Sequence, residues 1–236
     1  MKFNYVNAIR RTTFLCLMYC VLFGTVRAQS SDFFEYSKPN EQLYFKELIK
    51  TSNDELVGVL QQQSANAVVQ VAVRMDTLGN ILWAYEFDRS GRYYYENIVE
   101  LTNGNLVFGG NTDYAVQSPD TLIYTSLSSN GSYNWNKELR STNITSFQYN
   151  GLGSDGNSVH IPYSISVNGG TPTYYIAAYN GVTVNLNWRK SYSQNPGFRF
   201  ASHPNPGGGK FWAGNGSTMG GYQTFVLTKL NASGAF

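Results

Sequence analysis

Residues Arg74 to Phe87 read RMDTLGNILWAYEF, and this stretch decides the fold because versions of it return three more times. They are SLSSNGSYNWNKEL at 126–139, YNGVTVNLNWRKSY at 179–192 and the shorter KLNASGAF at 229–236. Trp83, Trp135 and Trp188 mark the first three versions and are spaced by 52 and 53 positions. Self-similarity at a fixed period indicates a repeat protein.

A second motif lies upstream of each version and keeps the same period. It is NDELVGVL at 53–60, NGNLVFGG at 103–110, DGNSVHIP at 155–162 and GGKFWAGN at 208–215. The apolar positions expected to be equivalent are Val57, Val107, Val159 and Trp212. Two motifs in one register define a unit of about 52 residues.

Each unit holds only short strand-like runs. Val69, Val71 and Val73 alternate with period two, and the runs are rich in Val, Ile, Tyr, Phe and Thr. The sequence therefore predicts an all-β fold, a β-propeller built from about four four-stranded blades of about 52 residues at 41–88, 89–140, 141–193 and 194–236. Two alternatives stay open, namely a four-blade ring and a larger propeller of which this sequence is a truncated part.

The expected strands are 41–49, 54–62, 67–75 and 80–87 in the first repeat, and 92–101, 105–111, 121–128 and 132–139 in the second. The third repeat should use 144–149, 157–167, 173–180 and 184–192, and the fourth 198–202, 209–215 and 222–230. Asn-Gly and Asp-Gly steps at 103–104, 130–131, 155–156 and 180–181 predict two-residue type I′ hairpins.

Residues 1–28 have the features of a secretory signal peptide. A basic start is followed by an apolar core from about Phe14 to Phe23 and by Val26-Arg27-Ala28 before Gln29. The only two cysteines, Cys16 and Cys20, fall inside it, so the mature chain has no thiol for disulfides or metal. Residues 29–40 form an N-terminal segment in which Phe33 to Ser37 could supply a strand that closes the last blade.

Cleavage of this signal changes the charge of the chain. The full sequence has 17 basic and 15 acidic residues, and the signal carries four of the basic ones and no acidic one, so the mature chain is slightly acidic. Such a surface lacks the clustered Lys and Arg that nucleic acid or anionic lipid requires. We expect no nucleic-acid partner and no membrane span after cleavage.

The paired motifs resemble the secreted propeller repeats of bacteria that use type IX secretion. VRMDTLGNILWAYEF at 73–87 and LTNGNLVFGG at 101–110 are most similar to that pattern, the resemblance covers about residues 41–236, and HIPYSI in the third repeat departs most from it. The resemblance implies secretion or cell-surface display, further blades and a C-terminal sorting domain. It also implies O-glycosylation at Asp-Ser/Thr steps, for which Thr77 and Thr121 are the candidates.

No catalytic, cofactor-binding or metal-binding motif accompanies the repeats. His160 and His203 lie in different repeats without a ligand at metal-binding spacing, and no nucleophile elbow, phosphate loop or calcium loop is present. The Trp-bearing run also resembles quinoprotein propeller repeats, but a vicinal cysteine pair is lacking. We therefore expect neither a cofactor nor a metal, and no enzyme activity.

Aromatic residues are the remaining functional lead. Tyr93, Tyr94 and Tyr95 are candidate binding aromatics, because three consecutive residues of one strand cannot all point inward and at least one should be exposed. The recurring tryptophans should instead pack between neighbouring blades. We expect an exported, non-enzymatic binding or adhesion module for a polysaccharide or surface protein. The alternative is an N-terminal accessory propeller fragment of a larger secreted enzyme or adhesin.

Overall fold

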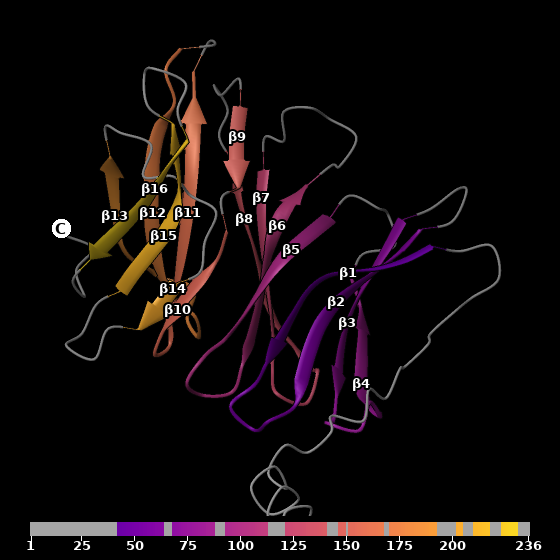
Figure 1. Ribbon diagram of the computed structural model, residues 1–236. Helices are drawn as coiled ribbons and strands as arrows, with labels where there is room; N and C mark the ends of the chain where they lie inside the picture. Colours follow the sequence, from indigo (N-terminus) through magenta and orange to yellow (C-terminus); the bar gives the residue numbers. More distant parts are fainter. Residues whose placement is uncertain are drawn as a thin grey trace, which may run out of the picture. The chain divides into compact units, whose positions relative to one another are not determined.

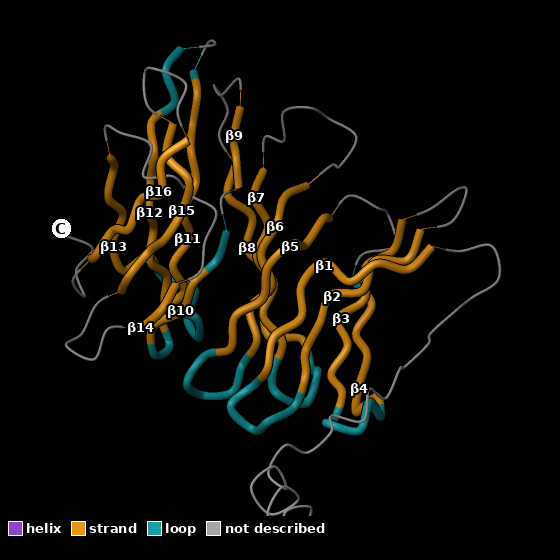
Figure 2. Tube along the Cα trace, viewed as in Figure 1, coloured by secondary structure: helices purple, strands orange, loops and turns teal. Residues whose placement is uncertain are grey.

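Antiparallel β-strands form all the regular secondary structure in the described part of the computed structural model (Figures 1 and 2). The structure describes residues 42–63, 68–87, 93–112, 121–140, 146–149, 151–167, 170–192, 202–204, 210–217 and 223–230. Side chains are described within 44–62, 68–87, 93–112, 121–140, 151–167 and 170–192. The chain divides into residues 1–35 and 36–236, and every described residue belongs to the second unit.

The first two repeats each form one sheet whose strands pair in chain order. Sheet A contains β1 (Gln42–Lys50), β2 (Leu56–Gln63), β3 (Val68–Met75) and β4 (Ile81–Glu86). Sheet B contains β5 (Tyr93–Glu100), β6 (Leu106–Thr112), β7 (Thr121–Leu127) and β8 (Tyr133–Arg140). Figure 2 shows the described turns that follow β1 and β5 at the same end of the strands.

The later repeats keep the same strand order with changes at the first strand. Sheet C contains β9 (Ser146–Tyr149), β10 (Gly153–Asp155), β11 (Ser158–Ser166), β12 (Thr173–Asn180) and β13 (Leu186–Tyr192). Both β9 and β10 pair with β11, so together they take the place of one first strand. Sheet D contains β14 (Ser202–Pro204), β15 (Lys210–Ser217) and β16 (Gln223–Leu230).

The all-β prediction is confirmed. In sheets A and B every strand starts and ends within two residues of its expected limits, because alternating apolar residues and turn residues mark them. The expected closing strand Phe33 to Ser37 and the signal peptide lie outside the described residues. No helix with the length and apolar character needed to cross a membrane occurs in the described part of the chain.

The turns lie where Asn-Gly and Asp-Gly predict them, but the expected turn type is wrong. Positive φ is found at Gly104 and Gly131 and not at the asparagine before either glycine. In the second of these turns the Gly131 N–H donates to the Ser128 carbonyl and the Ser128 N–H to the Ser132 carbonyl. This pattern is a type I turn followed by one left-handed residue, which needs glycine at only one position.

The expected register of the third repeat is also wrong by one residue. Val57 pairs through Arg74 with Trp83, and Val107 pairs through Ser126 with Trp135. The residue that pairs in this way with Trp188, through Ala178, is His160 and not Val159. A one-residue slip moves side chains to the opposite face of a sheet, and accordingly His160 lies beside the Trp188 ring at 5.5 Å.

Two apolar cores lie between consecutive sheets. The first joins sheet A to sheet B through Val57, Val59, Ala72, Phe87, Tyr95, Ile98, Leu106, Phe108, Ile123 and Leu127. The second joins sheet B to sheet C through Leu101, Val107, Leu122, Tyr124, Leu152, Val159, Ile161, Tyr163, Ala177 and Tyr179. Burial of these side chains between sheets is the main favourable term for the repeat packing.

Two of the three recurring tryptophans, Trp83 and Trp135, lie at these interfaces, as the sequence predicts. Trp83 Nε1 donates to the Ser129 carbonyl at 2.9 Å, and Trp135 Nε1 donates to the Gly181 carbonyl at 2.9 Å. Each acceptor is in the last described hairpin turn of the next sheet. The outer strand of one repeat is therefore tied to the outer turn of the following repeat.

Candidate functional site

The first strands of sheets A and B are bulged at the same position. Pairing between β1 and β2 passes from Phe45–Leu60 to Glu47–Val59 and leaves Lys46 out of the ladder. Pairing between β5 and β6 passes from Tyr95–Gly110 to Asn97–Gly109 and leaves Glu96 out. Both omitted residues are exposed. Bulges redirect side chains and are over-represented next to functional sites.

In sheet C the first strand is broken at the corresponding place. β10 pairs with β11 as far as His160, and β9 pairs with it from Tyr163 onward, so Ile161 and Pro162 have no strand-pairing partner on that side among the described residues. Proline has no N–H to give to a ladder and is tolerated at such irregular points. The interruption of the first strand therefore recurs in three consecutive repeats. We use the name inner-strand site for the bulged regions of β1 and β5, which carry Lys46, Glu47, Tyr94, Glu96 and Asn97.

Glu47 connects the two bulged strands. Its carboxylate accepts a hydrogen bond from the Ile98 backbone N–H and another from Asn97 Nδ2 at 3.4 Å. Burial raises the pKa of this carboxyl above its usual value, and the two hydrogen bonds oppose the shift in part. Glu47 thus fixes β5 against sheet A and keeps the neighbouring bulge residues in place.

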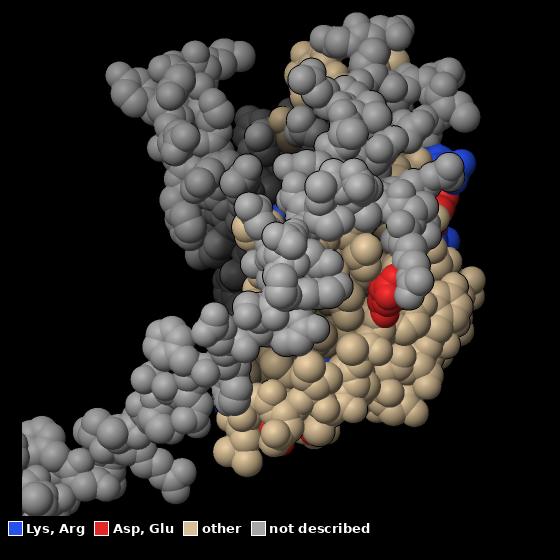
Figure 3. All heavy atoms as spheres, turned by 90° about the vertical axis from the view of Figure 1, so that its right-hand side faces the viewer, with Lys and Arg blue, Asp and Glu red and all other residues tan. Residues whose placement is uncertain are grey.

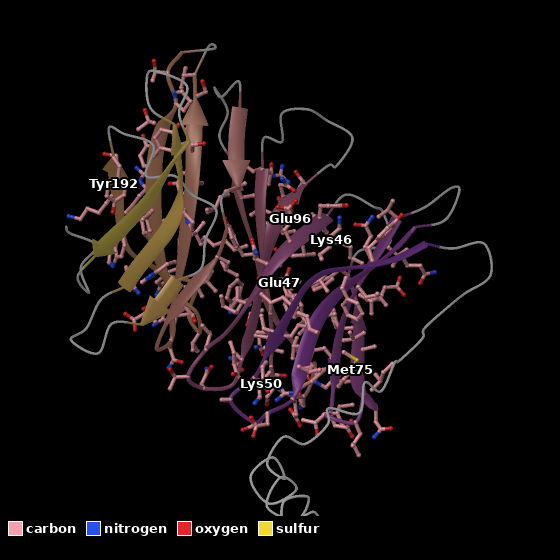
Figure 4. The ribbon with its side chains drawn as sticks, in the orientation of Figure 1. Lys46, Glu47, Lys50, Met75, Glu96 and Tyr192 are labelled. Carbon is pink, nitrogen blue, oxygen red and sulfur yellow. The ribbon has the colours of Figure 1, made fainter. Side chains whose placement is uncertain are left out.

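Lys46 and Tyr94 make the second contact between these strands. The Lys46 ammonium lies over the Tyr94 ring, 4.7 Å from its centroid, in a cation–π arrangement. Figure 4 shows the labelled side chains of Lys46, Glu47 and Glu96 together where β1 and β5 run side by side. The inner-strand site therefore offers one cation and one carboxylate from neighbouring repeats.

The three candidate tyrosines do not form an exposed platform, which corrects the expectation from the sequence. Tyr94 is 3% exposed and Tyr95 1% exposed, and Tyr93 is half-buried with its hydroxyl donating to Glu138. Tyr95 shares a hydrogen bond of 2.5 Å with Thr125, and burial raises its pKa. The reason is that both faces of β5 are covered, so alternation along the strand exposes none of them.

The two candidate glycosylation positions differ in accessibility. Thr77 is exposed in the turn between β3 and β4. Thr121 begins β7 and is 4% exposed. In the folded chain only Thr77 presents its hydroxyl to an enzyme.

His160 and Asp76, which lie outside this site, make structural contacts. His160 is buried beside Trp188, and His203 lies in β14, where side chains are not described. Asp76 accepts hydrogen bonds from the Leu78 and Asn80 N–H groups and from Asn80 Nδ2, and these contacts lower its pKa. Within the described ranges no group of three His, Cys, Asp or Glu residues could hold a metal ion.

Sequence reasoning missed Lys46, Glu47 and Glu96 although a signal was present. YFKELI at 44–49 aligns with YYENIV at 94–99 at the 50-residue spacing of the upstream motif. In both segments two aromatic residues precede two polar residues and two aliphatic ones. A polar pair at that point breaks the period-two pattern, which is the sequence signature that a bulge produces.

No family model and no curated protein matches the chain. Among solved structures, a europium-containing methanol dehydrogenase is similar over 82% of this chain and 43% of its own, with 12% sequence identity and a TM-score of 0.40. The chain thus spans less than half of that structure, and a similarity at this level carries no argument about activity.

Proposed function

We propose that this chain is an exported β-propeller module without enzyme activity, and that it binds a polysaccharide through the inner-strand site. The propeller arrangement is supported by the up-and-down order within sheets A and B and by the packing of each outer strand on the next repeat. The binding role is supported by the recurrence of the bulge in successive repeats.

The observation that carries the proposal is the exposure of two charged side chains at equivalent bulges. Lys46 supplies N–H donors and Glu96 supplies carboxylate acceptors, and sugar hydroxyls pair with both kinds of group. Glu47 and the Tyr94 ring hold the two strands that carry them. A few positioned polar groups on a rigid scaffold are what orients a bound ligand.

A glycan array and polysaccharides extracted from the host's cell surface test this proposal. Binding by the chain from Gln29 onward should weaken roughly tenfold or more in Lys46→Ala and in Glu96→Ala, since each loses a charge-assisted hydrogen bond. Lys50→Ala is the matched control, because Lys50 is on the same strand, 64% exposed and paired with Asp54 at 2.7 Å. Binding that is equal in all variants would refute the assignment of the site.

The test also separates a protein ligand from a carbohydrate. If no glycan binds but a purified surface protein does, with the same dependence on Lys46 and Glu96, the ligand is a protein. If nothing binds in either screen, the proposal of a binding module fails.

A second function, that of an accessory module in a larger secreted enzyme or adhesin, is supported by a different observation. The face of sheet A that points away from sheet B is apolar and partly exposed, with Phe45 and Leu48 about half exposed. Reading the gene beyond the codon for Phe236 tests this function, because an open reading frame that encodes a catalytic or adhesive domain would support it. A stop codon there would contradict it.

A further inference from the structure

The face of sheet A that points away from sheet B carries aliphatic and aromatic side chains at its centre. We call it the outer face, and it comprises Phe45, Leu48, Gly58, Leu60, Val71 and Val73. Phe45 is 53% exposed and Leu48 is 48% exposed, and their rings and methyl groups lie over Gly58. In Figure 3, viewed from the side on which sheet A lies in Figure 1, the described atoms belong mostly to uncharged residues.

The equivalent face of sheet B is fully covered. By strand pairing, Phe45 and Leu48 correspond to Tyr95 and Ile98, which are 1% and 3% exposed. Val71 corresponds to Ile123, which is 0% exposed. What covers these residues in sheet B is the face of sheet A that carries Val57, Val59, Ala72 and Trp83. We call that side of a repeat its tryptophan face.

Several polar contacts of this interface run from side chains of sheet A to backbone atoms of sheet B, and others involve the side chains of Glu100, which accepts from the Ser52 N–H and Oγ, and of Asn97, which donates to Glu47. Glu47 accepts from the Ile98 N–H, and Gln70 binds both the N–H and the carbonyl of Tyr95. Arg74 and Trp83 both donate to the Ser129 carbonyl. The contacts to backbone atoms require only the backbone shape of the receiving repeat, whereas the contacts to Glu100 and Asn97 also depend on its side chains.

Sheet A has this receiving backbone on its own outer side. Its first strand has the same bulge, so the Phe45 backbone and the Leu48 N–H correspond to those of Tyr95 and Ile98. Its last turn repeats the hydrogen bonds of the Ser128–Ser132 turn, which makes the Thr77 carbonyl the equivalent of the Ser129 carbonyl. Among the described residues, no donor reaches the Thr77 carbonyl.

We propose that the outer face of sheet A is a docking surface for the tryptophan face of one further repeat of this kind, additional to the four and carried on the same polypeptide. The interface between sheets A and B is the template for the contact. The docked repeat would cover Phe45 and Leu48, and its tryptophan would donate to the Thr77 carbonyl.

Cysteine labelling tests the surface, because the chain from Gln29 onward contains no cysteine. Leu48→Cys is made in this chain and in a lengthened chain with a second copy of residues 41–88 inserted before residue 41. Thiol labelling at position 48 should be fast in the first chain and at least about tenfold slower in the second, because a buried thiol reacts only through local opening. Leu186→Cys is the matched control, since Leu186 is 52% exposed on β13 and should label equally in both chains.

The other outcomes overturn the proposal in distinguishable ways. Slow labelling of the original chain at all concentrations means that its own residues cover the face, and labelling that slows with concentration means that a second copy does. Unchanged labelling in a folded, lengthened chain means that the face does not receive a repeat. A second lengthened chain, with residues 89–140 inserted instead, tests whether the result depends on which repeat is added. If neither lengthened chain folds, this also counts against the proposal.

Discussion

Replacing Trp135 by phenylalanine removes the indole N–H that donates to the Gly181 carbonyl, while an aromatic ring stays in place. The same replacement at Trp83 removes a donor from the Ser129 carbonyl, but that carbonyl keeps the Arg74 guanidinium at 2.8 Å. A partly buried hydrogen bond between neutral groups contributes about 1 kcal/mol to the free energy of unfolding. Loss of the bond destabilises the protein more when the acceptor is left without a partner than when the acceptor keeps a second donor. We therefore expect Trp135→Phe to lower the free energy of unfolding by about 1–2 kcal/mol, and Trp83→Phe by about 1 kcal/mol less.

Equilibrium urea unfolding followed by far-UV circular dichroism measures this difference, since tryptophan fluorescence changes with the substitutions. Trp188→Phe is the control, because the Trp188 indole makes no hydrogen bond within the described residues and its replacement changes only ring packing. The double variant Trp83→Phe/Trp135→Phe should show additive losses, since the two contacts lie in separate interfaces. A loss at Trp83 as large as that at Trp135 would refute the reasoning, because the second donor would then be irrelevant.

Three further predictions concern the charge, the turns and the modification of the chain. Glu47→Gln should make the free energy of unfolding depend less on pH. Because the pKa of Glu47 is raised in the folded state, the parent protein gains stability as the pH falls through that pKa toward 4.5. Urea unfolding at several pH values measures this dependence. If the pH dependence is unchanged in the variant, the carboxyl is not perturbed. Gly131→Ala should lower the free energy of unfolding by about 1–3 kcal/mol more than Gly104→Ala does in the same assay. Both glycines have positive φ, but a Cβ at position 131 would lie 2.7 Å from the Trp83 ring, whereas one at position 104 would lie 3.7 Å from Ser129. Equal losses would show that the ring moves aside freely. Any O-linked sugar on the exported protein should be found by peptide mass spectrometry at Thr77 and not at Thr121, and a sugar confined to Thr121 would mean that modification precedes folding.

Most of the fold could be predicted because the strands and turns of each repeat are marked by patterns within short segments of sequence. Apolar alternation in Val69 to Val73 and the glycine of each turn are properties of short segments, so they appear in the sequence without knowledge of the neighbours. The role of the tryptophans followed from their period, since a residue that recurs once per repeat contacts the same part of the next one.

The register of the third repeat could not be predicted, because SVHIPYSI is apolar on both faces and either register places suitable residues toward the core. Only pairing with β12 and β13 decides between Val159 and His160. The turn type was misjudged because Asn-Gly suits two kinds of hairpin that differ in loop length.

The candidate site was missed for a different reason. Exposure of a tyrosine in Tyr93 to Tyr95 depends on what covers the second face of β5, and that cover comes from residues far away in the sequence. The exposed side chains proved to be Lys46 and Glu96, which leave the ladder at bulges. A bulge depends on pairing with the neighbouring strand, so the strand's own alternation predicts it poorly.

Hydrogen exchange of the tryptophan indole N–H groups, followed by NMR on ¹⁵N-labelled protein, tests the central claim that each repeat is tied to the next through its outer-strand tryptophan. We expect slowed exchange for Trp135 and Trp83, with Trp135 the slower of the two, and faster exchange for Trp188. Exchange of Trp83 and Trp135 as fast as in the urea-unfolded chain would contradict the account.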